Sequence, residues 1–556
     1  APAAPAPAAA AVAPAAVEKE AVVQFPAEEG GNADTGTGGD TGGDAGDTGD
    51  TGGDTGTGEG DGSSTIPGAD PLPGGAVISK SLEYIKRIPN TNRTTEGKFD
   101  RVNGRDILVV NGNYGVKTID VTDPLNPVEL DTLLPSDLAS FYQGEDMDLD
   151  TKRKLLFLSL DPRHADIDQD ATGCRTNQTR DVRCRSGIYV ISYANPRALQ
   201  QIGDFIDVPA GHTTSCIDEC RFLWTGGPAR RDDLRYLGPY TPGGRGDGRP
   251  IWVTDMRDPY NPHVYGNAID LYRNDGITDY SHDVQVDADG IAWSSGRGGV
   301  RGYATSGRHR DPSTNNVREA TPWDPILVAG GGVDGVSTPE QMVMHNSARP
   351  LDNQILARGV KPGNILVSTE EQFNSDCASD GRIVISDLTD SWGGEPAQNS
   401  SVDNPYRMKE ISSWHPADAG EDLGPSASCS AHYFDIKESV LAAGFYAQGT
   451  RFLDLLNAGS PRQIGYYRVQ SDGTADNPSS NSFDVQFHGD YVWVFDTARG
   501  VEVLRLKEPT GVEYDEVKAP AAKADRYADK AAAAPSTVGL VCPIFEPSDA
   551  AVAAGL

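Results

Sequence analysis

One position recurs along the chain and restricts the folds that are open to it. A short polar segment opens on a histidine in four places, at His212, His282, His345 and His432. An apolar run follows each of them, then a second run ending near Asp, then a third. Phe99–Val102 and Phe483–Phe487 share this register without the histidine, and Glu145 puts a carboxylate there. Short β-type runs that return at regular spacing indicate a repeat fold, and we predict seven copies of one β unit.

Seven such units predict an all-β chain folded as a seven-bladed β-propeller. The last unit, which begins near Phe483, lacks a fourth strand before Lys507. Residues 82–88 alternate between apolar and polar side chains, and no other unit needs them. We predict that this segment completes the last sheet, because joining the two ends of the chain closes the ring and protects the sheet edges.

Composition sets the domain boundaries. Residues 1–75 are low-complexity, first Ala/Pro-rich and then Gly/Thr/Asp-rich, with ten acidic residues and no Lys or Arg between 28 and 61. Such a segment stays extended and solvated, so we predict a disordered linker; calcium binding by its carboxylates is the less favoured interpretation. The propeller is expected over 76–510, followed by a loosely ordered Ala-rich tail over 511–556.

The net charge of −33 restricts the partners. Nucleic acid and anionic lipid both require a basic surface, and neither is expected. No apolar run approaches the roughly 18 residues that span a bilayer. The partners that remain are an extracellular protein or glycan, or a small molecule at the mouth of the channel.

The beginning of the chain and its cysteines predict export. Residue 1 is Ala within an Ala/Pro-rich stretch, as expected after removal of a signal peptide. Cys174 and Cys184, and Cys216 and Cys220, are close pairs of the kind that form disulfides outside the cell. Seven cysteines leave one thiol over, and the sequence does not say which of Cys377, Cys429 and Cys542 it is. We expect a secreted or cell-surface protein.

The turns between strands resemble those of a known family. Gly115–Asp120 is followed by Val-Thr-Asp-Pro-Leu-Asn-Pro-Val at 121–128, and Pro250–Pro262 repeats the pattern. Weaker copies lie at Gly449–Asp454 and Gly187–Ser192. Over about residues 99–505 the chain resembles the LVIVD-repeat family of extracellular β-propellers. The resemblance implies the fold and the location, and it says little about activity.

The histidines are the candidate site. In a propeller the first strand of each blade lines the central channel, so residues at one register position converge near one mouth. His212, His282, His345 and His432 would come from four consecutive blades, with Glu145 from the blade before them. Imidazoles with a carboxylate suit a transition metal such as Zn, Cu or Fe. The alternative is structural: repeats arise by duplication, and a Gly-His pair orders the loop before the first strand in WD-repeat propellers. Both interpretations remain open.

Two functions follow, and the sequence does not decide whether the protein is an enzyme. The first is an extracellular binding or interaction module that uses the loops of one face. The second is a metal-dependent oxidoreductase or hydrolase with the four-histidine site on the propeller axis. No catalytic residue is assigned. Glu370-Glu371 is expected to be a surface pair, and the other histidines, His164, His263, His309, His415 and His488, are expected in solvated loops or turns.

Overall fold

The computed structural model describes the part of the chain that carries the predicted repeats. The described residues are 64–138, 145–160, 186–208, 210–227, 251–266, 269, 280–297, 299–312, 314–331, 343–351, 354–371, 381–392, 408–419, 430–471, 473–474 and 476–507. Two compact units divide the chain, Ala1–Gly52 and Gly53–Leu556. All described residues belong to the second unit. The predicted disorder before residue 64 and after residue 507 therefore lies outside the described residues.

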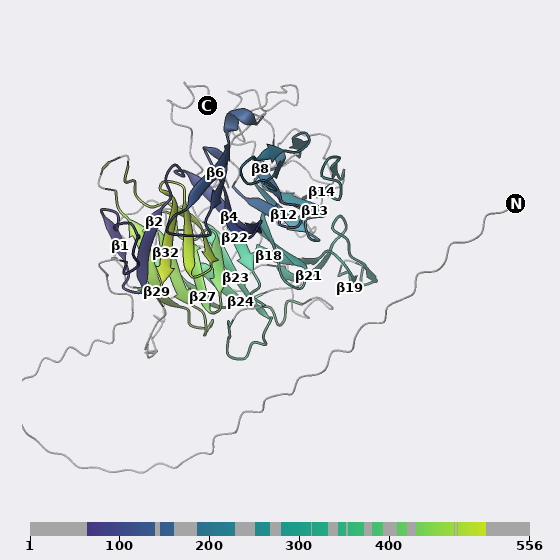
Figure 1. The fold of residues 1–556 in the computed structure, drawn as a ribbon. Coiled ribbons are helices and arrows are strands. Elements are labelled where there is room, and N and C mark those ends of the chain that lie inside the picture. Colours follow the sequence, from purple (N-terminus) through teal and green to yellow (C-terminus); the bar gives the residue numbers. More distant parts are fainter. Residues whose placement is uncertain are drawn as a thin grey trace, which may run out of the picture. The chain divides into compact units, whose positions relative to one another are not determined.

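The described strands form seven antiparallel units, here called blades 1 to 7, of which blades 4 and 5 are joined in one eight-stranded sheet (Figure 1). Blade 1 contains β3 (Thr94–Val102), β4 (Arg105–Gly112), β5 (Gly115–Asp120) and β6 (Val128–Leu133). Blade 2 contains β7 (Met147–Asp150), β8 (Leu155–Leu160), β9 (Gly187–Ser192), β10 (Gln200–Gln201) and β11 (Ile206–Asp207). Blade 3 contains β12 (Thr213–Ile217), β13 (Phe222–Gly226), β14 (Trp252–Asp255) and β15 (His263–Val264).

The remaining blades repeat this order. Blade 4 contains β16 (Tyr280–Val286), β17 (Ile291–Arg297), β18 (Gly299–Ala304) and β21 (Ile326–Gly331). Blade 5 contains β22 (Val343–Ala348), β23 (Ile365–Glu371), β24 (Ile383–Asp387) and β25 (Lys409–Trp414). Blade 6 contains β26 (Phe434–Lys437), β27 (Val440–Gly444), β28 (Thr450–Asp454) and β29 (Arg462–Val469), with β1 (Ala76–Ile78) added at its outer edge. Blade 7 contains β30 (Ser482–His488), β31 (Tyr491–Asp496) and β32 (Gly500–Leu506), joined by β2 (Leu82–Arg87).

Few described elements lie outside this plan. The hairpin β19 (Arg308–Arg310) and β20 (Val317–Glu319) is inserted between two strands of blade 4. Two short 3-10 helices, η1 (Pro135–Asp137) and η5 (Pro416–Ala419), follow the outer strands of blades 1 and 5. One pairing, Arg297 with Val343, joins blades 4 and 5 into one larger sheet. The fold class is confirmed: the described residues form an all-β, seven-bladed propeller.

Apolar packing between the blades closes the ring. Seven buried clusters each combine side chains of two neighbouring blades, from blades 1 and 2 around to blades 7 and 1. Members from neighbouring blades include Val109 with Leu156, Phe157 with Leu223, Trp224 with Ala292, Trp293 with Leu366, Ile383 with Leu441, Phe452 with Val494, and Val503 with Leu108. The middle strands of each blade are buried on both faces, which explains why their sequences are unbroken apolar runs.

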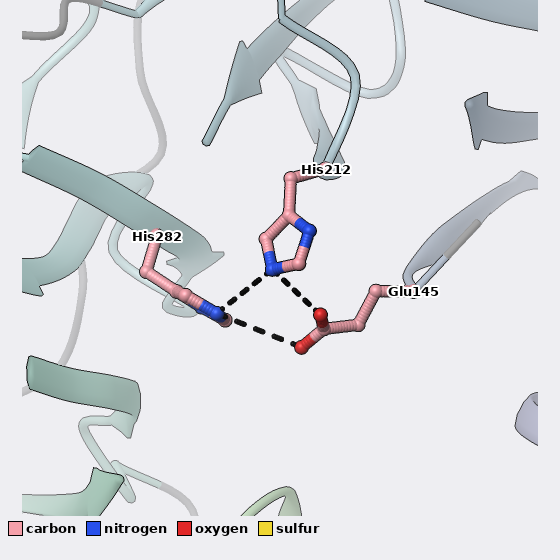
Figure 2. Close-up of side chains that lie close together, drawn as sticks. All are labelled: Glu145, His212 and His282. Carbon is pink, nitrogen blue, oxygen red and sulfur yellow. Dashed lines mark hydrogen bonds and ion pairs between the residues drawn. The ribbon is translucent and has the colours of Figure 1, made fainter. Parts of the chain in front are cut away.

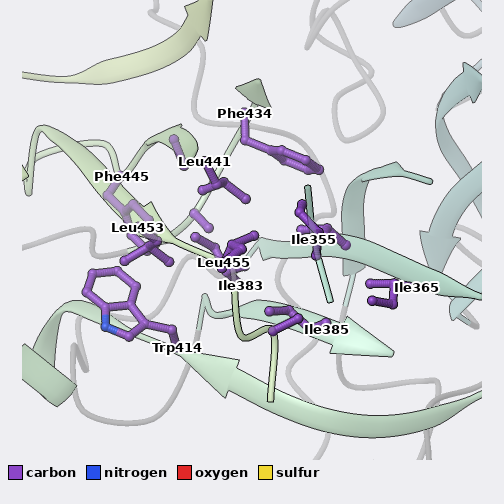
Figure 3. Close-up of a cluster of buried hydrophobic side chains, with 14 residues drawn as sticks. Ile355, Ile365, Ile383, Ile385, Trp414, Phe434, Leu441, Phe445, Leu453 and Leu455 are labelled. Carbon is purple, nitrogen blue, oxygen red and sulfur yellow. The ribbon is translucent and has the colours of Figure 1, made fainter. Parts of the chain in front are cut away.

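Figure 3 shows the cluster between blades 5 and 6, where Ile383, Leu441 and Leu453 interdigitate. Each of these three side chains is fully buried. Truncating one of them to Ala would cost about 2–5 kcal/mol, because the rigid sheets on either side cannot collapse into the space.

The first segment of the propeller closes the last blade, as the sequence predicts. β2 pairs antiparallel with β32, so that Tyr84 lies opposite Leu504. Figure 1 shows β2, from the start of the chain, beside β32, from its end. The residues from Ser64 onward, which the sequence analysis assigns to the linker, contact the same blade: the Thr65 hydroxyl donates to Glu83, and Lys86 pairs with Asp70.

One of the two predicted disulfides is present, between Cys216 and Cys220 at the end of β12. Cys174, Cys184, Cys377, Cys429 and Cys542 lie outside the described residues. The part of the chain that the structure describes has no helix long and apolar enough to cross a membrane.

Candidate metal centre

The innermost strands carry the candidate residues to the axis. β3, β7, β12, β16, β22, β26 and β30 are the first strands of their blades, and neighbours in this series contact one another around much of the ring. β-Bulges in blades 1, 4 and 7 skip Thr95, His282 and Phe483, and the bulge in blade 5 skips His345 and Asn346. A bulge turns the extra residue out of the pleat, which is a common way of aiming a side chain at a site.

We call the resulting set of seven residues the ring position. Its members, from blade 1 to blade 7, are Thr95, Glu145, His212, His282, His345, His432 and Phe483. The predicted register is therefore right in six blades and wrong in blade 1. There the predicted residue is Phe99, which pairs with Leu108 farther along β3, whereas the bulge lies at Thr95. β3 is nine residues long and its ring-position residue is a threonine, so neither a histidine nor an acid marks that position in the sequence.

The four histidines and Glu145 are brought together. Glu145 Oε2 lies 2.6 Å from His212 Nε2, and Glu145 Oε1 lies 2.9 Å from His345 Nε2. The same Oε1 atom is 3.4 Å from His432 Nε2 and 3.6 Å from His282 Nε2. Figure 2 shows His212, His282 and Glu145 pointing toward one another from three different blades. All five side chains are buried.

The imidazoles present their Nε2 atoms to the same space. His212 Nε2 and His282 Nε2 are 3.0 Å apart. Two nitrogens bound to one ion at about 2.0–2.1 Å and at right angles would be separated by about 2.9 Å. Three overlapping groups, Glu145 with His212 and His282, Glu145 with His345 and His432, and His282 and His345 with Glu371, each have ligand atoms within 4.8 Å of one another. This buried His/Glu cluster can hold a metal ion.

Backbone contacts fix the orientation of individual rings. His432 Nδ1 lies 2.8 Å from the carbonyl oxygen of Phe483 in blade 7. A carbonyl oxygen only accepts, so Nδ1 carries the hydrogen and the lone pair of Nε2 faces the cluster. Gly227, with a φ of +102°, lies against His212, and any side chain there would overlap the His212 Cβ. Local geometry thus selects one arrangement of these rings.

Burial favours the neutral form of two of the imidazoles, His282 and His345, and the cluster favours an ionised Glu145. Burial and the neighbouring His345 hold the pKa of His282 well below its usual range. Burial and His432 lower the pKa of His345 in the same way. Burial acts to raise the pKa of Glu145, but His212 and His282 outweigh it and the pKa lies well below the usual value. These are the protonation states in which both side chains donate lone pairs to a metal.

Glu371 is the residue that sequence reasoning misplaced. Glu370 and Glu371 were expected at the surface, and both are buried. Glu370 pairs with Arg382 at 2.5 Å. Glu371 ends β23 beside the histidines, with its carboxylate 3.8 Å from His432 Nε2 and 3.9 Å from His282 Nε2. One feature of the sequence could have identified Glu371: the Glu370-Glu371 pair ends an apolar strand that runs beside the first strand of blade 5.

Two tyrosines complete the surroundings, and the sequence did not point to either. Tyr446 donates a hydrogen bond from its hydroxyl to Glu371 Oε1. Tyr433 follows His432 directly, and the centres of these two rings are 4.8 Å apart. Phe483, at the ring position of blade 7, has its ring centre 3.7 Å from that of His432. These aromatic rings enclose the metal-ligand candidates on the side of blades 6 and 7.

The other histidines were predicted to lie in solvated loops or turns, and the structure places most of them elsewhere. His415 is buried, and His263, His309 and His488 lie in β15, β19 and β30 rather than in loops. His488 stacks on Phe99, with ring centres 4.2 Å apart. His164 lies outside the described residues.

Comparisons with known proteins support no assignment beyond the fold. No family model matches the chain, so membership of the LVIVD-repeat family is not shown. No curated protein matches it either. The chain is similar to the β-propeller domain of Cps50 (Swd1) from Myceliophteria thermophila, at 10% identity and a TM-score of 0.41, over 77% of this chain and 100% of that one.

Two further solved structures are similar at the same level. One is the extracellular domain assigned to a hybrid two-component system from B. thetaiotaomicron, at 10% identity and a TM-score of 0.42, over 76% of this chain and 39% of that one. The other is the WD40-repeat domain of RRP9, at 10% identity and a TM-score of 0.39, over 77% of this chain and 100% of that one. Function must therefore be argued from the site of this chain.

Proposed function

We propose that the protein is a metalloprotein with one transition-metal ion on the propeller axis. The ligands are Nε2 of His212, His282, His345 and His432 together with the carboxylate of Glu145. The observation that carries the proposal is the convergence of four imidazoles from four successive blades on one carboxylate, with the closest contacts at 2.6 and 2.9 Å. Structural histidines would each bond to the backbone of their own blade, whereas here the Nε2 atoms of all four lie within 3.6 Å of the Glu145 carboxylate.

The donor set favours iron or copper over zinc. Zinc sites in proteins are almost always four-coordinate, whereas five donors converge here, with Glu371 close by. The donors are nitrogen and oxygen without thiolate, which suits Fe or Cu. An iron or copper centre enclosed by aromatic rings supports oxidation–reduction chemistry, so oxidoreductase is the activity class that we propose.

The chain's own residues have distinct parts in this proposal. Glu145 holds its two oxygens toward different histidines and keeps the ligands together. Glu371 and Tyr446 form a hydrogen-bonded pair at the edge of the cluster, where they can accept and return a proton. The surrounding packing excludes bulk water, which strengthens every electrostatic contact at the site.

The interaction module stays a prediction. It would use loops around the propeller, and several of the longest connections, such as 161–185 and 228–250, lie outside the described residues. Secretion also stays a prediction, which the Cys216–Cys220 disulfide supports.

Metal analysis tests the proposal directly. Purified protein is incubated separately with Fe(II), Cu(II) and Zn(II), desalted, and analysed by mass spectrometry for metal per chain. We expect about one tightly held ion in the wild type and almost none in His282→Ala. His415→Ala is the matched control, because His415 is a buried histidine that follows β25, the outer strand of blade 5. Equal metal content in the two variants, or none in the wild type, would exclude the centre.

A further inference from the structure

A second ring of polar side chains lies one residue beyond the ring position. Its members, from blade 1 to blade 7, are Glu96, Asp146, Thr213, Asp283, Asn346, Tyr433 and Asp484. Every one of them is at most 5% exposed. Each of them directly follows the ring position, in the innermost strand of its blade or immediately before it, so together they form the next layer of the channel. This second ring contains no histidine and differs in its chemistry from the first.

The second ring concentrates negative charge. Four of its seven members are carboxylic acids, and Lys98 lies with its Nζ 2.6 Å from Glu96 Oε1. One ammonium group balances one of four carboxylates. Burying charges without partners is costly, so a layer of this composition calls for further cations or protons.

Two of the four acids form hydrogen bonds that join neighbouring blades. Glu96 accepts the Met147 N–H at 2.5 Å, and Asp146 accepts the Thr214 N–H at 3.0 Å, so each bonds the innermost strand of the next blade. Asp283 and Asp484 bond within their own strands instead. Gln285 Nε2 donates to Asp283 Oδ2 at 3.0 Å, and Gln486 Nε2 donates to Asp484 Oδ2 at 3.1 Å.

Three consecutive blades place buried oxygen atoms in this layer without hydrogen-bond partners among the described residues. They are Asp283 Oδ1 in blade 4, Asn346 Oδ1 in blade 5 and Tyr433 Oη in blade 6. Burial, and then the charges of Asp283, Glu145 and Asp146, raise the pKa of Tyr433, so its hydroxyl stays protonated beside these acids. Buried oxygens of this kind are normally bonded, so three at one register position indicate a common ligand.

We propose that Asp283, Asn346 and Tyr433 form a second cation site, which takes a hard, oxygen-preferring ion such as Ca²⁺. Carboxylate, amide and water oxygens are the usual Ca²⁺ ligands, and a site of 6–8 ligands leaves room for waters beside these three side chains. Imidazole-preferring metals are not expected here, because the layer offers them no nitrogen. The ion would connect blades 4, 5 and 6 and offset the charge of the second ring.

Calcium titration followed by calorimetry, and Tb³⁺ luminescence, test the site on the full-length protein. Tb³⁺ substitutes for Ca²⁺ and is excited through a tyrosine that ligates it. We expect one Ca²⁺ bound per chain above the weak background of the acidic segment at 28–61, and tyrosine-sensitised Tb³⁺ emission. Asp283→Asn should weaken Ca²⁺ binding by more than the about tenfold that loss of an outer contact causes. Tyr433→Phe should abolish most of the emission.

Two controls separate this site from the histidine cluster and from folding. Asp148→Asn alters another acid of an innermost strand, which accepts the Cys216 N–H at 2.8 Å, and it should leave Ca²⁺ binding unchanged. His282→Ala should remove the transition metal and keep Ca²⁺. Circular dichroism establishes whether each variant is folded. If Asp283→Asn does not fold, Tyr433→Phe tests the site in its place. Ca²⁺ binding that is equal in wild type and in folded Asp283→Asn and Tyr433→Phe, or absent from all, would mean that the oxygens bind water only, and the proposal would be overturned.

Discussion

Glu145 Oε2 lies 2.6 Å from His212 Nε2, although 67 residues separate them in the sequence and they belong to different blades. Glu145 precedes β7 and His212 precedes β12, so the contact exists because both occupy the ring position. The second oxygen of Glu145 is equally engaged, 2.9 Å from His345 Nε2 in blade 5. A single carboxylate thus spans blades 2, 3 and 5 at the axis, and its removal should affect the whole cluster.

The two acids of the cluster should differ in their effect on metal affinity. Glu145 lies within 3.6 Å of all four imidazoles, whereas Glu371 lies 3.8 Å from His432 Nε2 and 3.9 Å from His282 Nε2. Glu371→Gln should therefore lower metal affinity by about 10–100-fold, as loss of an outer-sphere partner does, and Glu145→Gln should lower it further. Competition with a chelator of known affinity measures both. The reverse order would assign Glu371 as the ligand and Glu145 as its support.

Tyr446 should position Glu371. Its hydroxyl donates to a buried carboxylate, and loss of a hydrogen bond to a charged group costs about 1.5–3 kcal/mol. We expect Tyr446→Phe to lower both the free energy of unfolding and the metal affinity. Tyr193→Phe is the matched control, since Tyr193 of blade 2 donates to the carboxylate of Asp100 in blade 1 at 2.9 Å. It should lower stability in urea unfolding and leave metal affinity unchanged. Equal metal affinities in the two variants would assign Tyr446 a structural part alone.

The sequence predicted the repeat because repetition is a local signal. Each blade contributes short apolar runs, and four of them add a Pro/Asp/Asn turn; these patterns do not depend on distant contacts. Closure by residues 82–88 was predictable for the same reason, since one strand was missing at the end and one was left over at the beginning. The edge strand β1 was missed because Ala76–Ile78 is too short to show a period.

The candidate site was only partly predictable. Histidines at a repeated position stand out in a sequence, so the residue pattern alone identifies His212, His282, His345 and His432. Glu371 and Tyr446 come from strands and turns that neighbour the innermost strands, and their approach to the axis depends on the twist of blades 5 and 6. The sequence shows that a histidine directly precedes each of Asp283, Asn346 and Tyr433. Because these are three different residue types, no repeated pattern in the sequence groups them, and only the strand register of the structure does so.

The closing strand should be required for a stable monomer. β2 covers the edge of β32, and Tyr84 donates to Glu502 across the two strands. A chain that begins at residue 64 keeps β2 and should fold as a monomer with unchanged thermal stability. A chain that begins at residue 89 leaves the edge of β32 open, and we expect aggregation or dimers, because an unpaired edge strand pairs with other chains. Size-exclusion chromatography with light scattering measures this. Two monomers of equal thermal stability would show that β2 is dispensable.

Asp484 should make stability depend on pH. Burial, and then the charge of Glu96, raise the pKa of Asp484 to about 8, against the opposing effect of Lys98, and Asp435 adds to the increase. An acid whose pKa is higher in the folded than in the unfolded protein binds its proton more tightly when folded. Its ionisation therefore destabilises the fold progressively as pH rises from about 4 to about 8, by at most on the order of 1.4 kcal/mol per pH unit.

Asp484→Asn removes this ionisation and should gain stability relative to the wild type as pH rises. Urea unfolding of chelator-treated protein at pH 5, 7 and 9 measures the difference between the two free energies of unfolding. Asp123→Asn is the control: hydrogen bonds from Asn126 and Leu125 lower the pKa of Asp123, so it stays ionised throughout this range and its difference from the wild type should be constant. An Asp484→Asn difference that is also constant would mean that Asp484 is already ionised at pH 5, with Lys98 compensating its charge.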